Sequence, residues 1–227
     1  MLNGGAISVK DAKKLISSSY DKSKVDQEGY KIDHALSGQR VKVFTNPQGK
    51  AFVVHRGTKG FRDVVTDAKL MLGMKNNNRY NHAKKIQKEA ELKYGAKNIT
   101  TLGHSLGGDV ANTVGKKSHE IITLNKASAQ PWQAKPSNQI DIRTTIDPVS
   151  LLGKLQKSNG REINIPSTSF NPLTEHSSDV LDRIENQDEV LGTGLNNKWM
   201  QHVKSVQKEN GVSYKEAMKL AKKTYKK

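Results

Sequence analysis

A serine flanked by glycines is the residue of this chain whose type and spacing point most directly to chemistry. Residues 103–108 read Gly-His-Ser-Leu-Gly-Gly, which places Ser105 in a G-x-S-x-G pattern. In this pattern a strand ends in a sharp turn, a helix follows, and the serine hydroxyl is exposed as a nucleophile. Glycines are needed on both sides because the strand, turn and helix backbones approach too closely for a Cβ atom. Ser105 is therefore the candidate nucleophile.

The residues on both sides of this serine have the composition that such a turn requires. Residues 98–102 are largely β-branched and apolar, which predicts a short buried strand. Residues 109–115 carry small and apolar side chains at helical spacing. The alternative is a glycine-rich turn whose serine only caps the following helix. The strand–turn–helix context favours the nucleophile.

A serine hydroxyl needs a base to take its proton, and the base needs an acid to orient it. In α/β-hydrolases these residues follow the serine in the order Asp or Glu, then His. Asp147 comes after the predicted strand 139–146, at the end where sites form in open α/β sheets, and is preferred to Asp141 within that strand. His176 is preferred to His202, which lies in a basic tail. The alternative for Asp147 is an ordinary Asp-Pro turn, and the alternative for His176 is a polar residue at a helix N-terminus.

The negative charge that develops on the substrate oxygen needs two preorganised donors. The first expected donor is the backbone N–H of Leu106, the residue after the nucleophile. The second is expected from the loop after an earlier strand, and residues 56–58 form such a loop. Thr58 can offer both its N–H and its hydroxyl.

The elements that must position these residues alternate between strands and helices after about residue 50. This alternation predicts an α/β fold with a mostly parallel sheet and helices on both faces. The predicted strands are 41–45, 51–55, 98–102, 120–124, 139–146 and 163–165, the first two joined by a hairpin turn at 46–50. The predicted helices are 8–19, 61–73, 81–94, 109–115 and 177–185.

Composition narrows the class of protein. The chain has 227 residues, a formal net charge of +16 and no cysteine, so disulfides and thiol chemistry are excluded. We expect no signal peptide, no membrane span, no metal site and no cofactor. The charge favours anionic partners such as nucleic acid, an acidic lipid surface or an acidic protein.

Much of the excess charge lies in residues 198–227, which hold nine lysines and two glutamates. Ser213 and Glu216 have the spacing of a capping box, and Gly211 separates two predicted helices. The expected apolar face of the second helix consists of Tyr214, Ala217, Leu220, Ala221 and Tyr225. We therefore expect a hydrolase domain at 1–197 and a basic helical tail at 198–227.

Taken together, the motifs of this chain resemble the class 3 lipases, an α/β-hydrolase family. The resemblance rests on residues 53–58 with Arg62 and residues 66–67, on residues 103–108 and on residues 147–149. The resemblance implies a triad of Ser105, Asp147 and His176 and an oxyanion hole of Thr58 and Leu106. It also implies that Asp67 orients the oxyanion-hole hydroxyl. Residues 69–80 then form either a lid or a core helix. The connections between the triad residues are short for the family, which leaves substrate preference open.

The lysine-rich C-terminus resembles short termini on proteins of large DNA viruses and their virophages, where compact lipase-like proteins also occur. The sequence assigns no location, and a viral origin implies the host cytoplasm or a virion. The leading hypothesis is a serine esterase or lipase that acts on triacylglycerols or phospholipids at a membrane or lipid interface. The alternatives are an inactive hydrolase scaffold whose tail binds nucleic acid or a virion component, and a triad enzyme acting on thioesters or peptides.

Overall fold

The computed structural model describes most of the chain and divides it into two compact units, Met1–Leu191 and Gly192–Lys227. The sequence predicts this boundary at residue 197, and a separate function for each unit stays a prediction. The described residues are 7–58, 78–127, 135–150, 160–184, 187, 190–191 and 198–224. Within these ranges, no helix combines the length and the apolar character that a membrane span needs, and no group of three metal-ligating side chains occurs.

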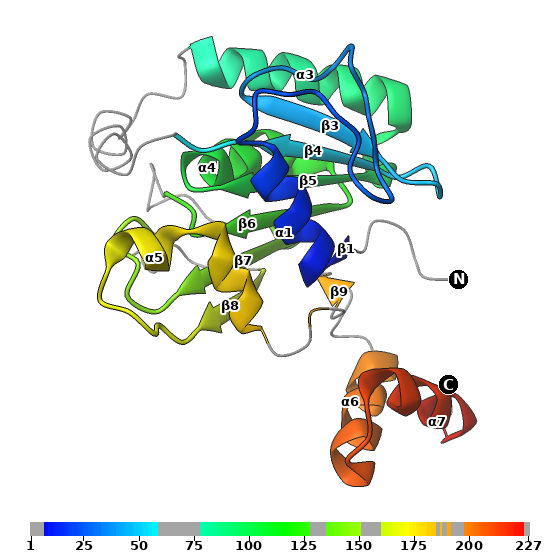
Figure 1. Ribbon diagram of the computed structural model, residues 1–227. Coiled ribbons are helices and arrows are strands. Elements are labelled where there is room, and N and C mark those ends of the chain that lie inside the picture. The colour runs from blue at the N-terminus through cyan, green and yellow to red at the C-terminus, as the bar shows by residue number, and fades with distance from the viewer. Residues whose placement is uncertain are drawn as a thin grey trace. The chain divides into compact units, whose positions relative to one another are not determined.

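The first unit is built on a seven-stranded sheet with the order β2-β3-β4-β5-β6-β7-β8 (Figure 1). The pairs from β4 to β8 are parallel, and β2, β3 and β4 pair antiparallel. The strands are β2 Lys31–Ile32, β3 Val41–Thr45, β4 Ala51–His55, β5 Ile99–His104, β6 Glu120–Leu124, β7 Gln139–Thr144 and β8 Arg161–Ile165. The predicted α/β class with a mostly parallel sheet is confirmed.

Helices cover both faces of this sheet. On one face α1, Val9–Ser18, packs its buried residues against Phe44, Phe52 and Leu102. On the other face α3, Asn78–Tyr94, packs Ile86 and Ala90 against the alternate strand residues, such as Val53. This alternation follows from the strand geometry, which points successive side chains to opposite faces. The other helical segments among the described residues of this unit are η1 Ala96–Asn98, α4 Leu106–Val114, η2 Gly115–Lys117, α5 Pro172–His176 and η4 Ser178–Arg183.

A second, two-stranded sheet joins the beginning and the end of the first unit. β1, Ile7–Ser8, pairs antiparallel with β9, Val190–Leu191, so that Ile7 lies opposite Leu191. Both of these side chains are buried in the same apolar cluster as α1. The N-cap of α1 comes from β1, because the Ser8 hydroxyl accepts a hydrogen bond of 3.1 Å from the Asp11 N–H.

The structure changes several details of the predicted elements. The strand at 139–146 ends at Thr144, and Ile146, which the period-2 pattern placed among its apolar positions, is 47% exposed in a turn. The helix predicted at 177–185 is the short segment η4, directly preceded by α5. β1, β2 and β9 have two residues each, too few for an alternating pattern to identify. The helix predicted at 61–73 lies outside the described residues.

The second unit is a helical hairpin, α6 Lys198–Asn210 and α7 Tyr214–Thr224, which we call the tail hairpin. Its small core holds Val203, Val206, Ala217 and Ala221. The hydrogen bond from the Glu216 N–H to Ser213 Oγ and the return contact from the Ser213 N–H form the predicted capping box.

Two residues of the tail hairpin qualify the sequence prediction. Gly211 has a φ of +60°, which explains why glycine separates the helices. Leu220, expected on the apolar face of the second helix, is 37% exposed, whereas Ala217 and Ala221 of that face are buried.

Candidate active site

Ser105 lies at the turn between β5 and α4, where the backbone adopts a conformation that serine rarely takes. Its φ is +57° and its ψ is −129°, and α4 begins at the next residue. Such a conformation costs of order 1–3 kcal/mol and persists only where the surrounding structure enforces it. The side chain is 1% exposed, and its Oγ has no hydrogen-bond partner in the described part of the chain. A serine in a strained turn between a strand and a helix has the backbone geometry of a nucleophile elbow.

Two glycines allow the close contacts around this turn. A Cβ atom on Gly103 would lie 2.2 Å from the carbonyl oxygen of Gly107, and one on Gly107 would lie 2.1 Å from that of His55. Both neighbours are backbone atoms and cannot turn away. The sequence reason for glycine at these positions is therefore steric, as the G-x-S-x-G pattern predicts.

The structure brings the predicted base and acid together. His176, the last residue of α5, places its Nδ1 3.0 Å from Oδ1 of Asp147. Both side chains are buried. Because a carboxylate only accepts, Nδ1 carries the proton in this pair and Nε2 of the neutral ring is the basic nitrogen.

The turn after β7 fixes the Asp147 carboxylate. The backbone N–H of Ser150 donates to Oδ2 at 2.9 Å, and that of Val149 donates to Oδ1 at 3.3 Å. The Asp-Pro turn that the sequence offered as an alternative reading is thus present, and the same carboxylate that caps it faces His176.

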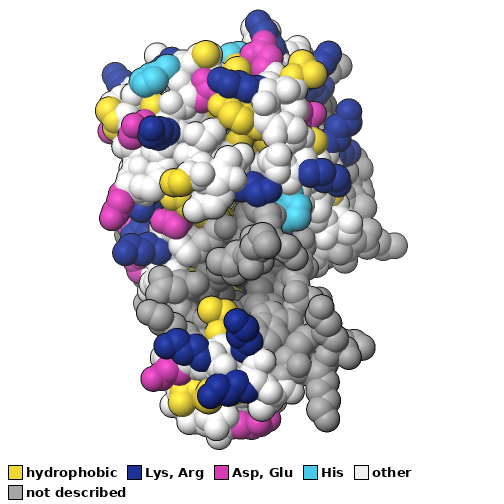
Figure 2. Space-filling view, turned by 90° about the vertical axis from the view of Figure 1, so that its right-hand side faces the viewer, with side chains coloured by type: hydrophobic (Ala, Val, Ile, Leu, Met, Phe, Trp, Pro, Cys, Tyr) yellow, Lys and Arg dark blue, Asp and Glu magenta, His cyan; other side chains and the backbone are white. Residues whose placement is uncertain are grey.

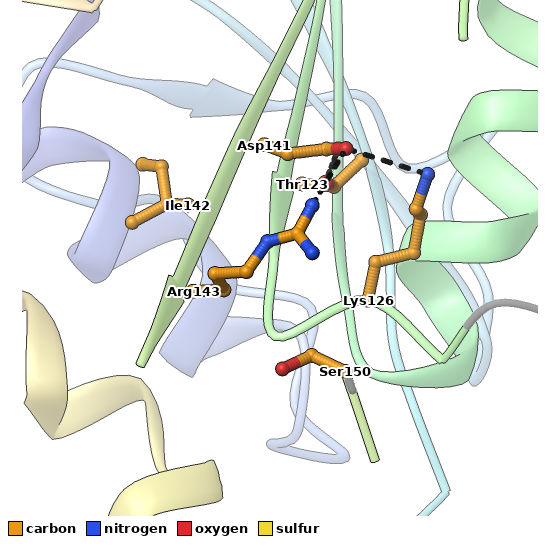
Figure 3. A pocket seen from close by; sticks show the side chains of 6 residues that line it. All are labelled: Thr123, Lys126, Asp141, Ile142, Arg143 and Ser150. Atoms are coloured by element: carbon orange, nitrogen blue, oxygen red, sulfur yellow. Dashed lines mark hydrogen bonds and ion pairs between the residues drawn. The ribbon is translucent and has the colours of Figure 1, made fainter. Parts of the chain in front are cut away.

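Asp141 lies instead in a buried ionic cluster beside the Asp147 turn (Figure 3). Its carboxylate is 2.8 Å from Lys135 Nζ, 3.5 Å from an Arg143 guanidinium nitrogen and 3.6 Å from Lys126 Nζ. Burial alone would raise the pKa of Asp141, but Lys126, Lys135 and a hydrogen bond from Thr123 lower it to about 2. These contacts give Asp141 a structural role.

The predicted oxyanion loop lies against Ser105. A Cβ atom on residue 57 would lie only 2.8 Å from the Ser105 Cβ, so only glycine fits at this position. Thr58 follows at once and is half-buried. Leu106 is the first residue of α4, where backbone N–H groups lack partners within the helix. The two expected donors thus come from elements on either side of Ser105.

Two further predictions concern the segment after this loop. Asp67, the expected support of the oxyanion hole, and residues 69–77 of the expected lid lie outside the described residues. Residues 78–80 begin α3. Tyr80 is buried there, and its hydroxyl donates to Asp109 Oδ2 at 2.5 Å. The structure thus shows a helix for these three residues, with Tyr80 in the core and Asn78 exposed.

Sequence analysis did not identify three polar residues around the site. Glu175, buried next to His176, accepts hydrogen bonds from the Ser169 and Thr168 N–H groups and pairs with Arg183 at 2.8 Å. Tyr20 and His104 contact one another and the segments around Ser105. His104 stands beside Ser105 in the sequence, which was the available signal for it; Tyr20 belongs to no motif.

The parallel sheet and the strained serine turn together define an α/β-hydrolase fold. The sequence matches the family described as phospholipase-like, Tle-like phospholipase domain, over residues 10–135, more than half of its length. The chain therefore belongs to this family and is a phospholipase-like hydrolase. The predicted relation to lipases is confirmed at this level, whereas the viral form stays a prediction. The matched segment includes Ser105 and ends before Asp147 and His176.

Two solved lipase structures are similar to this chain. A triacylglycerol lipase from Penicillium expansum is 16% identical, with a TM-score of 0.45, and the match covers 70% of this chain and 79% of that one. A lipase–propeptide complex from Rhizomucor miehei is 15% identical, with a TM-score of 0.44, and the match covers 85% of this chain and 83% of that one. No curated protein matches the sequence.

Proposed function

We propose that this protein hydrolyses carboxylic esters of lipids through an acyl-enzyme formed on Ser105, with His176 as base and Asp147 as its orienting acid. The observation that carries the proposal is the strained turn that holds an unpaired, buried Ser105 hydroxyl. The 3.0 Å contact between His176 and Asp147 supplies the remaining pair.

Each step of the proposed reaction uses one of these groups. His176 Nε2 takes the hydroxyl proton as Ser105 Oγ bonds to the ester carbonyl carbon, and Asp147 stabilises the imidazolium. The N–H of Leu106 and the N–H or hydroxyl of Thr58 donate to the resulting oxyanion. The tetrahedral intermediate collapses, the C–O bond to the alcohol breaks, and His176 gives its proton to the leaving oxygen. Water, activated by the same histidine, then releases the fatty acid.

Family membership supports a phospholipid as the substrate, and triacylglycerol is the second candidate that the lipase resemblance offers. The chain's net charge of +16 would concentrate the enzyme on anionic membranes, and salt would weaken this attraction. An inactive scaffold is less well supported, because the nucleophile, base, acid and oxyanion loop are all present in the expected order. Thioesters and peptides share the chemistry and are distinguished only by assay.

A fluorophosphonate probe tests the proposed nucleophile directly. Incubation with the wild-type protein at neutral pH is expected to label Ser105 with one probe per chain, identified by mass spectrometry of the peptide. Labelling of His176→Ala is expected to be slower by at least about 100-fold, because the base no longer takes the serine proton. Labelling at another residue, or equal rates for both proteins, would contradict the assignment.

We further infer that the tail hairpin binds an anionic membrane surface. Its exposed lysines include Lys208 on α6 and Lys219, Lys222 and Lys223 on α7. Figure 2 shows Lys and Arg side chains, in dark blue, on the described part of this unit. Each lysine near an anionic surface contributes about 1 kcal/mol. The hairpin would thus hold the hydrolase unit close to its substrate.

Charge neutralisation on α7 tests this partner. The triple variant Lys219→Gln, Lys222→Gln, Lys223→Gln is expected to bind vesicles of anionic phospholipid about 100-fold more weakly at low salt. The matched control neutralises three exposed lysines of α3, Lys84, Lys85 and Lys88, and should lose less affinity. Equal losses would refute a specific role for the tail hairpin. Lost retention on DNA with unchanged vesicle binding would instead support nucleic acid as the partner.

A further inference from the structure

The hydroxyl of Tyr20 lies at the centre of a hydrogen-bond chain that connects three segments around Ser105. It is 3.0 Å from the backbone N of Gly57 in the oxyanion loop and 2.6 Å from Nδ1 of His104. The other ring nitrogen of His104, Nε2, is 2.7 Å from the backbone oxygen of His176. Residues far apart in the sequence, just after α1, before and within the elbow, and at the end of α5, thus share one chain of contacts.

The chemistry of the end groups fixes the direction of each hydrogen bond. The carbonyl oxygen of His176 only accepts, so His104 Nε2 carries the proton. A neutral ring with its proton on Nε2 has an acceptor at Nδ1, so the Tyr20 O–H donates to it. The Tyr20 oxygen then accepts from the Gly57 N–H, which is itself only a donor. Every group in the hydrogen-bond chain has a role that matches its partner, and for a neutral His104 ring no other set of directions satisfies both ends.

Burial keeps the groups of this hydrogen-bond chain, His104 and Tyr20, in one protonation state. Burial and the adjacent His176 lower the pKa of His104 to about 3, although its hydrogen bond to the His176 backbone opposes this effect. Burial raises the pKa of Tyr20 to about 12, against the opposing effect of the Gly57 N–H. A neutral His104 is also what the proposed mechanism needs. Its ring centroid is 5.0 Å from that of His176, and a charge there would oppose formation of the His176 imidazolium.

The chain holds the two sides of the site at a fixed separation. The Gly57 N–H is one peptide unit before Thr58, the expected oxyanion donor. The His176 carbonyl belongs to the residue whose ring is the expected base. A displacement of about 1 Å in either group would lower the rate by up to about 100-fold.

We propose that Tyr20 and His104 are positioning residues that set the oxyanion loop and the His176 backbone relative to Ser105. Neither side chain needs to touch the substrate for this role. The inference rests on the proposed esterase function, and its test separates the two.

The first test is Tyr20→Phe, which keeps the ring and leaves the Gly57 N–H and His104 Nδ1 without the hydroxyl. We expect kcat on a soluble ester to fall about 10-fold or more with little change in KM, because the transition state needs the alignment more than the bound ester does. The matched control is Tyr94→Phe at the end of α3, away from the site, which removes a partly buried hydrogen bond of 2.7 Å from the Tyr94 hydroxyl to Asp33. This control is expected to keep the wild-type kcat at a comparable loss of thermal stability.

The outcomes distinguish failure of the inference from failure of the proposed function. A Tyr20→Phe kcat within twofold of the Tyr94→Phe value would overturn the positioning role. Nitrogen-15 spectra of the wild-type protein give a readout that needs no activity. His104 is expected as a neutral ring with its proton on Nε2 at pH 7, and that signal should change in Tyr20→Phe alone. A proton on Nδ1 of His104 would refute the proposed hydrogen-bond chain. The expected spectrum together with no ester hydrolysis would refute the proposed esterase function but not the hydrogen-bond chain.

Discussion

Replacing Ser105 with alanine is expected to lower the rate of lipid-ester hydrolysis by about 10⁴-fold to 10⁶-fold. Alanine retains the turn and both expected oxyanion donors but has no atom that can form the acyl-enzyme. The measurement is fatty-acid release from phospholipid vesicles, triacylglycerol emulsions and a short-chain p-nitrophenyl ester. The matched control is Ser17→Ala, an exposed serine of α1. A Ser105→Ala rate within tenfold of wild type on every substrate would exclude Ser105 as the nucleophile.

The same variant has an expected effect on folding that separates catalysis from stability. The Ser105 hydroxyl is buried and has no hydrogen-bond partner among the described residues, so its removal takes away a desolvation cost of about 1–3 kcal/mol. Alanine and serine share the cost of the positive φ. Thermal unfolding of Ser105→Ala should therefore occur at an equal or higher temperature than that of the wild type. A lower temperature would indicate that the hydroxyl makes a stabilising contact.

Acid is expected to destabilise the hydrolase unit from about pH 6.5 downward, because two buried histidines must stay neutral in the folded protein. Burial lowers the pKa of His55 and of His104 from the ordinary 6.5 to about 3. For His55, Arg79 and His82 add to this effect. Both rings are therefore neutral in the folded protein, whereas in the unfolded chain they are protonated below about pH 6.5.

The direction of the pH effect follows from these shifts. Because the folded pKa values are depressed, the stability that the neutral rings provide is complete above pH 6.5 and is lost as the pH falls toward 3. Each histidine is expected to lower the free energy of unfolding by about 1.4 kcal/mol per pH unit in this range. At pH 4.5 the two together would remove roughly 5 kcal/mol, a large share of a typical domain stability.

Urea denaturation between pH 7 and pH 4.5 measures this loss. The variant His55→Leu removes one of the two titrating rings at a site whose Nε2 has no hydrogen-bond partner in the described structure, so an apolar side chain is tolerated. As the pH is lowered, the free energy of unfolding of His55→Leu should fall with about half the wild-type slope. Parallel pH curves for the two proteins would show that His55 does not control acid stability.

The sequence predicted most of the sheet well, because its longer strands depend on local patterns. Strands 41–45, 51–55 and 120–124 were recognised with the observed bounds, since each alternates or concentrates β-branched residues between turn signals. Asp147 was separated from Asp141 by its place after the strand, and the structure puts the former beside His176 and the latter in an ionic cluster.

What escaped prediction depends on contacts between distant segments. Tyr20 follows an amphipathic helix like any surface tyrosine, and only the folded chain brings it to the oxyanion loop and to His104. The pairing of Lys135 and Arg143 with Asp141 likewise needs three-dimensional proximity. Ile146 was misplaced because an alternating pattern does not mark where a strand stops.

The pairing of β1 with β9 makes the hydrolase unit a closed loop of chain. Ile7 and Leu191 are partners across a ladder, so the first and last described residues of the unit are neighbours. A short linker between these ends, with new termini opened elsewhere, would give a circularly permuted unit that keeps the sheet order. The tail hairpin follows β9 in the sequence, so it is an addition after the strand that closes this loop.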